Sequence, residues 1–178
     1  IISLFLMMIS RSVASASRIL EVLEEEPDIV DPVNAVMEVK DGEIEFRNVN
    51  FKYEDDSEEN NLENINIKIK AGETVGIIGS TGSGKTSLVQ LIPRLYDATN
   101  GEVFVGGRNV KEYNIEALRN SVAMVLQKNT LFSGTIAENL RWGNAEATEA
   151  QIEAAASSSC VDEFIDRLPG RYDMHIEQ

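Results

Sequence analysis

A run of glycines and hydroxyl side chains near the middle of the chain ends in a lysine and a threonine. It reads Gly79-Ser80-Thr81-Gly82-Ser83-Gly84-Lys85-Thr86, which matches the P-loop pattern G-x-x-x-x-G-K-[ST]. Glycines let successive backbone N–H groups point inward at a polyphosphate, and the ammonium of Lys85 reaches the β and γ phosphates. The hydroxyl of Thr86 is a suitable ligand for Mg²⁺. These residues therefore predict a nucleotide site.

The segments on either side of the loop have the patterns of the strand and the helix that a P-loop requires. Residues 74–78 are short, apolar and rich in β-branched side chains, which predicts a buried strand. Residues 87–92 carry apolar side chains at helical spacing, and the start of that helix adds N–H donors and a positive dipole end. The motif alone leaves the use of the nucleotide open, because kinases, GTPases, motors and transporters share it.

Period-two patterns predict an antiparallel β unit before the P-loop. Residues 43–51 and 62–70 each alternate polar with apolar side chains, and a polar acidic loop joins them. The expected fold class is therefore α/β, with a P-loop NTPase core and an antiparallel β subdomain. Further strands are expected at 102–105 and 121–126, and helices at 115–119, 135–142 and 148–168, the last with Thr148 and Gln151 as a candidate capping box.

Length and charge limit the class of protein. The chain has 178 residues, room for one domain and an appendage, and a formal net charge of -14. This acidity argues against a broad surface for nucleic acid, which needs clustered positive charge. Cys160 and His175 are each the only residue of their type. A disulfide within the chain and a cysteine- or histidine-based metal cluster are therefore not expected.

The N-terminal residues predict a helix with two possible settings. Residues 1–25 place apolar side chains along one stripe, and the first nine are apolar on nearly every side. Nine helical residues span roughly 14 Å, which is too short to cross a bilayer. The helix could be the cytoplasmic end of a membrane span, because Arg11 and Arg18 follow this run and positive charge marks the cytoplasmic side. The alternative is an amphipathic helix packed on a soluble domain. Prolines then predict a linker at 27–41, with the domain starting near Gly42.

Several segments together resemble the nucleotide-binding domain of an ABC transporter of the exporter type. The resemblance covers about residues 41–178. It rests on motifs in the expected order: Phe51-Lys52-Tyr53, the P-loop, Gly101-Glu102-Val103, Val125-Leu126-Gln127, the run Thr130 to Leu140, and Leu168-Pro169-Gly170.

The resemblance implies a site for ATP and Mg²⁺. In that family an aromatic at the position of Tyr53 stacks on adenine, and residues 79–86 hold the phosphates. Ser87 would contact the α phosphate. Gln127 would position Mg²⁺ or the attacking water at the start of a loop that faces the membrane domain. Residues 1–26 would be the cytoplasmic end of a transmembrane helix, residues 27–41 a linker, and residues 42–178 the N-terminal part of the nucleotide-binding domain.

The partners that the family implies are the transmembrane domain of the same protein and a second nucleotide-binding domain, identical or different. The protein would lie in the cell membrane with this domain on the cytoplasmic side, and the intact protein would be an ATPase that drives export. The L-S-G-G-Q and Walker B segments of the family come after the point that matches Gln178, so the domain is expected to be incomplete at its C-terminus.

We therefore expect this chain alone to bind ATP without hydrolysing it. The alternatives are a soluble ABC-type ATPase and a module that only binds nucleotide.

Overall fold

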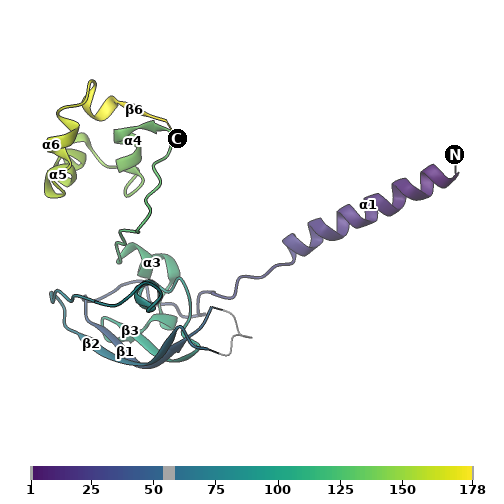
Figure 1. Cartoon of the computed structure of the whole chain (residues 1–178), viewed down its shortest axis with the longest axis horizontal. Coiled ribbons are helices and arrows are strands. Elements are labelled where there is room, and N and C mark those ends of the chain that lie inside the picture. Colours follow the sequence, from purple (N-terminus) through teal and green to yellow (C-terminus); the bar gives the residue numbers. More distant parts are fainter. Residues whose placement is uncertain (1, 54–58, 178) are drawn as a thin grey trace. The chain divides into compact units, whose positions relative to one another are not determined.

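The alternating stretches pair into one antiparallel sheet (Figure 1). This computed structural model describes residues 2–53 and 59–177, apart from the side chains of residues 4–6. At the centre, β1 (Ile44–Phe51) lies between β2 (Leu62–Ile69) and β3 (Asn100–Val105), and β4 (Arg108–Asn109) pairs with β3. The strands predicted at 43–51, 62–70 and 102–105 are confirmed, as is the antiparallel pairing of the first two. Part of the acidic loop, 54–58, lies outside the described residues.

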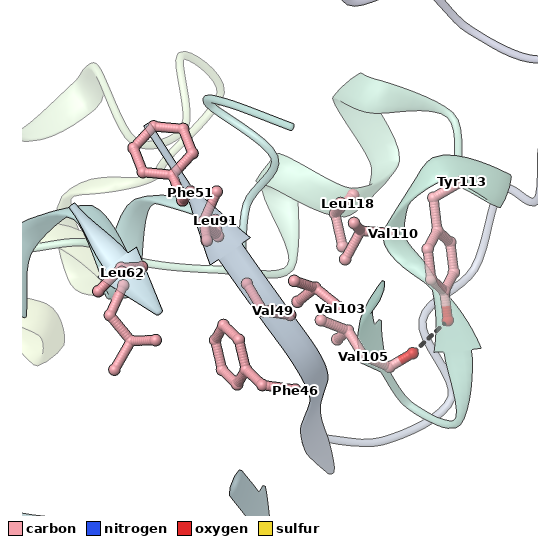
Figure 2. Packing of buried hydrophobic residues seen from close by; sticks show 11 residues of the cluster. Phe46, Val49, Phe51, Leu62, Leu91, Val103, Val105, Val110, Tyr113 and Leu118 are labelled. Carbon is pink, nitrogen blue, oxygen red and sulfur yellow. Dashed lines mark hydrogen bonds between the residues drawn. The ribbon is translucent and has the colours of Figure 1, made fainter. Parts of the chain in front are cut away.

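Short helices pack against this sheet. They are α2 (Lys85–Gln90), the 3-10 turn η1 (Val110–Glu112) and α3 (Ile115–Asn120). The helices predicted at 87–92 and 115–119 are thus present, the first starting two residues early. Figure 2 shows the buried cluster in which β1, β3 and these helices meet. Its members are Phe46, Val49, Phe51, Leu62, Leu88, Leu91, Val103, Val105, Val110, Tyr113 and Leu118.

Tyr113 closes one end of this core. Its ring is fully buried, and its hydroxyl donates a hydrogen bond of 2.8 Å to the carbonyl oxygen of Val105 on β3 (Figure 2). Burial raises the pKa of the Tyr113 hydroxyl, which keeps the group protonated as a donor. The hydroxyl of Tyr113 is therefore buried together with a hydrogen-bond partner.

The two apolar runs predicted as buried strands, 74–78 and 121–126, are not strands. Both are irregular, and among the described residues no strand pairs with either of them. Ile78 is 100% exposed and Val125 is 92% exposed. A strand needs hydrogen-bonded neighbours, and a parallel strand buried on both faces needs them on both sides. The composition of these runs favours such a strand, but the described residues supply no neighbour.

The N-terminal helix α1 (Ile2–Leu23) confirms the predicted helix at 1–25. Within the part of the chain that the structure describes, no helix is long and apolar enough to cross a membrane. The described side chains of α1 are exposed.

The segment that follows α1, predicted as a linker, is tied to the sheet domain at three points. The carboxylate of Asp31 accepts hydrogen bonds from the Asn114 side chain at 2.6 Å and from the backbone N–H of Ile115 at 2.7 Å. Val36 forms a β-bridge with Tyr113. The guanidinium of Arg94 donates to the carbonyl oxygen of Val30 at 3.3 Å. Residues 30–36 are thus held on the domain before Gly42.

The chain divides into two compact units, Ile1–Ala123 and Met124–Gln178. The second unit contains α4 (Ile136–Arg141), α5 (Glu149–Ser158), α6 (Asp162–Ile165), the turn η2 (Arg171–Asp173), and the paired β5 (Gly134–Thr135) and β6 (His175–Ile176). Ala137, Ile152, Ala156 and Ile165 are buried. The helix predicted at 135–142 is confirmed, whereas the one predicted at 148–168 is divided in two around Cys160, whose φ of 57° is not helical.

Candidate nucleotide site

The P-loop depends on two glycines with left-handed backbone. Gly82 has φ 83° and Gly84 has φ 80°, a region that other residues adopt at a cost. A Cβ at Gly84 would also lie 2.7 Å from the carbonyl oxygen of Asn61 and 2.7 Å from a methyl carbon of Leu62. Position 84 therefore needs glycine for its backbone angle and for the close approach of β2. Position 82 needs it for the angle alone.

Lys85 is held over the loop by oxygen atoms. Its ammonium donates to the carbonyl oxygens of Gly79 at 2.9 Å and Ser80 at 2.7 Å, and to the hydroxyl of Ser83 at 3.3 Å. Thr86, the next residue of α2, is exposed. The structure thus places the Lys85 ammonium against oxygen atoms of the loop, and its contact with phosphates stays a prediction.

Tyr53 follows the end of β1 and is joined to α2 by hydrogen bonds. The hydroxyl oxygens of Tyr53 and Ser87 lie 2.8 Å apart, within hydrogen-bonding distance. The Tyr53 hydroxyl also donates to Oε1 of Gln90 at 3.2 Å. Ser87 is buried, and its hydroxyl is hydrogen-bonded to that of Tyr53. Two predicted site residues, Tyr53 and Ser87, therefore contact each other directly.

The ring of Tyr53 also lies in an aromatic group. Its centroid is 4.8 Å from that of Phe51 at an interplanar angle of 78°, and 5.1 Å from that of Tyr96 at 88°. Both are edge-to-face arrangements, which the ring quadrupole favours. Tyr53 remains 48% exposed. A hollow of about 330 Å³ lies beside the two tyrosines, lined by Asp28, Ile29, Phe51, Lys52, Tyr53, Tyr96, Asp97, Ala98 and Thr99.

Gln127 belongs to the second unit, where it is exposed in an irregular stretch. Its predicted contact with Mg²⁺ or water therefore stays a prediction.

Sequence reasoning did not single out Gln90 and Tyr96. Gln90 lies three residues after Ser87, a spacing that places both on one face of a helix, and this was the available signal. Tyr96 lies beyond the helix, in a turn whose course the spacing of side chains does not indicate. Only the fold places its ring against Tyr53.

Comparison with known proteins gives one consistent family. The family model described as ABC transporter matches residues 62–175. The chain is 40% identical over 170 residues to the putative multidrug export ATP-binding/permease protein YgaD of Bacillus subtilis, covering 94% of this chain and 29% of that protein. It is 37% identical over 168 residues to the uncharacterized ABC transporter ATP-binding protein YfiC of the same organism, covering 94% and 28%.

A solved structure agrees with these relatives. The structure of a bacterial Atm1-family ABC exporter with ATP bound superposes with a TM-score of 0.87 at 27% identity, covering 96% of this chain and 30% of that one. The chain thus spans less than a third of the length of the proteins that it matches.

Proposed function

Because this chain belongs to the ABC transporter family, we propose that it holds ATP on the P-loop at 79–86, with the adenine on Tyr53. The observation that carries this proposal is the joining of Tyr53 to the P-loop helix. The hydroxyl bonds to Ser87 and Gln90 put an aromatic ring on the same rigid element that begins with Lys85. A base and a chain of phosphates need such a pair of subsites.

Each group has a separate task in binding. Backbone N–H groups of the loop and the Lys85 ammonium donate hydrogen bonds to the phosphate oxygens. When the phosphates bind, Lys85 gives up its bonds to the carbonyl oxygens of Gly79 and Ser80. Thr86 suits Mg²⁺, which prefers oxygen ligands and usually binds through few protein groups, substrate phosphates and water. The ion, when bound, neutralises phosphate charge. Ser87 is proposed to contact the α phosphate. Gln127 is proposed to position the Mg²⁺ or the attacking water.

For the whole protein we propose export across a membrane, driven by ATP hydrolysis. The relative YgaD is named an export ATP-binding/permease protein, and the matched structure is of an ABC exporter. The partners would be a transmembrane domain of the same protein and a second nucleotide-binding domain. Residues 1–26 would end a transmembrane helix on the cytoplasmic side, followed by the linker 27–41 and the nucleotide-binding domain from residue 42.

The described chain is proposed to bind ATP without turning it over. The 178-residue sequence contains no L-S-G-G-Q motif and no Walker B motif. Phosphoryl transfer to water depends on such groups to position the nucleophile and the metal.

The test compares two lysine variants. Mg-ATP binding to the 178-residue chain is measured by titration calorimetry for the parent, Lys85→Ala and Lys70→Ala. Lys70 is an exposed lysine just after β2. Loss of a charge-assisted bond should weaken binding by about tenfold or more in Lys85→Ala, while Lys70→Ala keeps the parent affinity. Equal affinity of all three would exclude the loop as the site. Sustained phosphate release by the pure chain would contradict the proposed inactivity.

A further inference from the structure

Four side chains fix the orientation of the Tyr53 ring. Phe51 and Tyr96 meet it edge-to-face, and Ser87 and Gln90 hold its hydroxyl. Phe51 is a core residue, and Ser87 already belongs to the proposed phosphate site. Gln90 and Tyr96 have no such assignment.

We propose that Tyr96 and Gln90 are positioning residues that hold the Tyr53 ring ready to stack on the base of the nucleotide. This inference rests on the proposed function, since it assumes that Tyr53 contacts the base. It adds that the orientation of the ring is set by α2 and the turn after it, rather than by β1 alone.

The need for such support follows from the place of Tyr53. The residue stands just past the last residue of β1 and keeps 48% of its surface exposed. An exposed aromatic side chain at a strand end has rotamer freedom that stacking would remove, and this loss of entropy weakens binding. Contacts that fix the ring before the base arrives reduce that loss. Tyr96 restricts the ring plane, and Gln90 restricts the hydroxyl end.

The turn that carries Tyr96 is itself firmly held. Arg94, only 6% exposed, forms a two-pronged ion pair with Asp97 through Nε at 2.8 Å and Nη2 at 3.2 Å. The backbone N–H of Leu95 also donates to the carbonyl oxygen of Gln90 at 3.1 Å. Tyr96 is therefore tied to the C-terminal end of α2, while the P-loop lies at the start of the same helix. The base and phosphate subsites are joined through α2.

This arrangement predicts which part of the ligand depends on the two residues. Stacking concerns the base, whereas Lys85 and the loop concern the phosphates. Loss of the Tyr96 or Gln90 side chain should lower the affinity for a ligand that carries a base. The affinity for a ligand made only of phosphates should stay unchanged. The ratio of the two affinities therefore separates positioning of Tyr53 from a general loss of structure.

The experiment measures binding of Mg-ATP and of inorganic tripolyphosphate with Mg²⁺ to the 178-residue chain. The variants are Tyr96→Leu and Gln90→Leu, with Tyr96→Phe and Gln90→Glu as conservative partners. Tyr96→Phe keeps the ring, and Gln90→Glu keeps an oxygen that accepts from the Tyr53 hydroxyl. We expect each leucine variant to bind ATP about two- to tenfold more weakly, with tripolyphosphate affinity unchanged and the conservative variants near the parent.

Four results would overturn the proposal. Equal losses for both ligands would mean that the variants damage the whole site. Unchanged ATP affinity in both leucine variants would mean that Tyr53 needs no support. A parent chain that binds both ligands equally would mean that the nucleoside adds no net affinity, although the P-loop binds phosphates. A parent that binds neither ligand would instead remove the proposed function itself, and the inference with it.

Discussion

The side-chain oxygens of Tyr53 and Ser87 lie 2.8 Å apart and connect the end of β1 with the helix that follows the P-loop. Ser87 is buried, and Tyr53 is not. The bond therefore ties an exposed aromatic side chain to the interior of the sheet domain. The same contact bears on stability and on the proposed nucleotide site.

Removing the Ser87 hydroxyl should lower the free energy of unfolding. Ser87→Ala takes away a buried partner of Tyr53, and a net hydrogen bond contributes about 1 kcal/mol. Alanine recovers part of this through its higher helix propensity, so we expect a loss of about 0.5–1 kcal/mol by urea denaturation. The control is Ser158→Ala, at an exposed helical serine whose hydroxyl donates to the carbonyl oxygen of Ala154. A loss as large in the control would contradict the importance of burial.

Two glycines of the P-loop should respond differently to alanine. Gly82 and Gly84 both have positive φ, so each substitution costs about 1–2 kcal/mol in backbone strain. Only at Gly84 does an added Cβ meet Asn61 and Leu62, and such overpacking costs about 1–3 kcal/mol more. Gly84→Ala should therefore unfold at clearly lower urea concentration than Gly82→Ala. Coincident unfolding curves would show that the loop moves away from β2 without cost.

The antiparallel sheet could be predicted because its patterns are local. The alternation around Phe46 and Ile67 identifies one buried face, and these two residues lie opposite each other. Between Phe46 and Val49 the register shifts, which the alternation does not indicate. The capping box of Thr148 and Gln151 was equally visible, because its two residues are three apart on one helix start. Such features need few contacts with distant parts of the chain.

The strands expected at 74–78 and 121–126 show where this reasoning stops. A run of apolar β-branched residues indicates a buried strand only if neighbouring strands exist, and the pattern does not state which they are. The side chains of Ile78 and Val125 are exposed in these irregular segments. The contact of Tyr96 with Tyr53 was missed for a related reason, since the path of a turn is set by tertiary contacts such as the Arg94–Asp97 pair.

The buried Arg94 should contribute more to stability than an exposed arginine. Arg94→Met removes the two bonds to Asp97 and the bond to Val30 while keeping a long side chain. We expect a loss of about 1.5–3 kcal/mol, the range for hydrogen bonds to charged groups. Arg108→Met, which removes an exposed pair with Glu112 at 3.4 Å, should cost about 0.5 kcal/mol or less. Similar losses in both variants, measured by urea denaturation, would refute the role assigned to burial.

The two capping boxes of the second unit should differ in their response to acid. At the start of α4, Glu138 accepts a hydrogen bond of 2.7 Å from the backbone N–H of Thr135, and the Thr135 hydroxyl accepts from the N–H of Glu138. The pKa of Glu138 is lowered, chiefly by its hydrogen bond with the backbone of Thr135 and next by the bond with the Thr135 side chain. At the start of α5, uncharged Gln151 takes the corresponding place beside Thr148.

The direction of the pH effect follows from the lowered pKa. The folded state favours the charged form of Glu138, so this stabilisation is complete above the pKa of the unfolded chain and disappears as pH falls through the lower, folded pKa. Glu138→Gln should therefore lose less stability than the parent on acidification below about pH 4.5, the ordinary value of the group. Gln151→Glu should add a new acid-sensitive component at α5. The measurement is urea denaturation across pH 3 to 7, followed by the fluorescence of Trp142, the only tryptophan. Parallel pH profiles for the parent and Glu138→Gln would rule out this coupling.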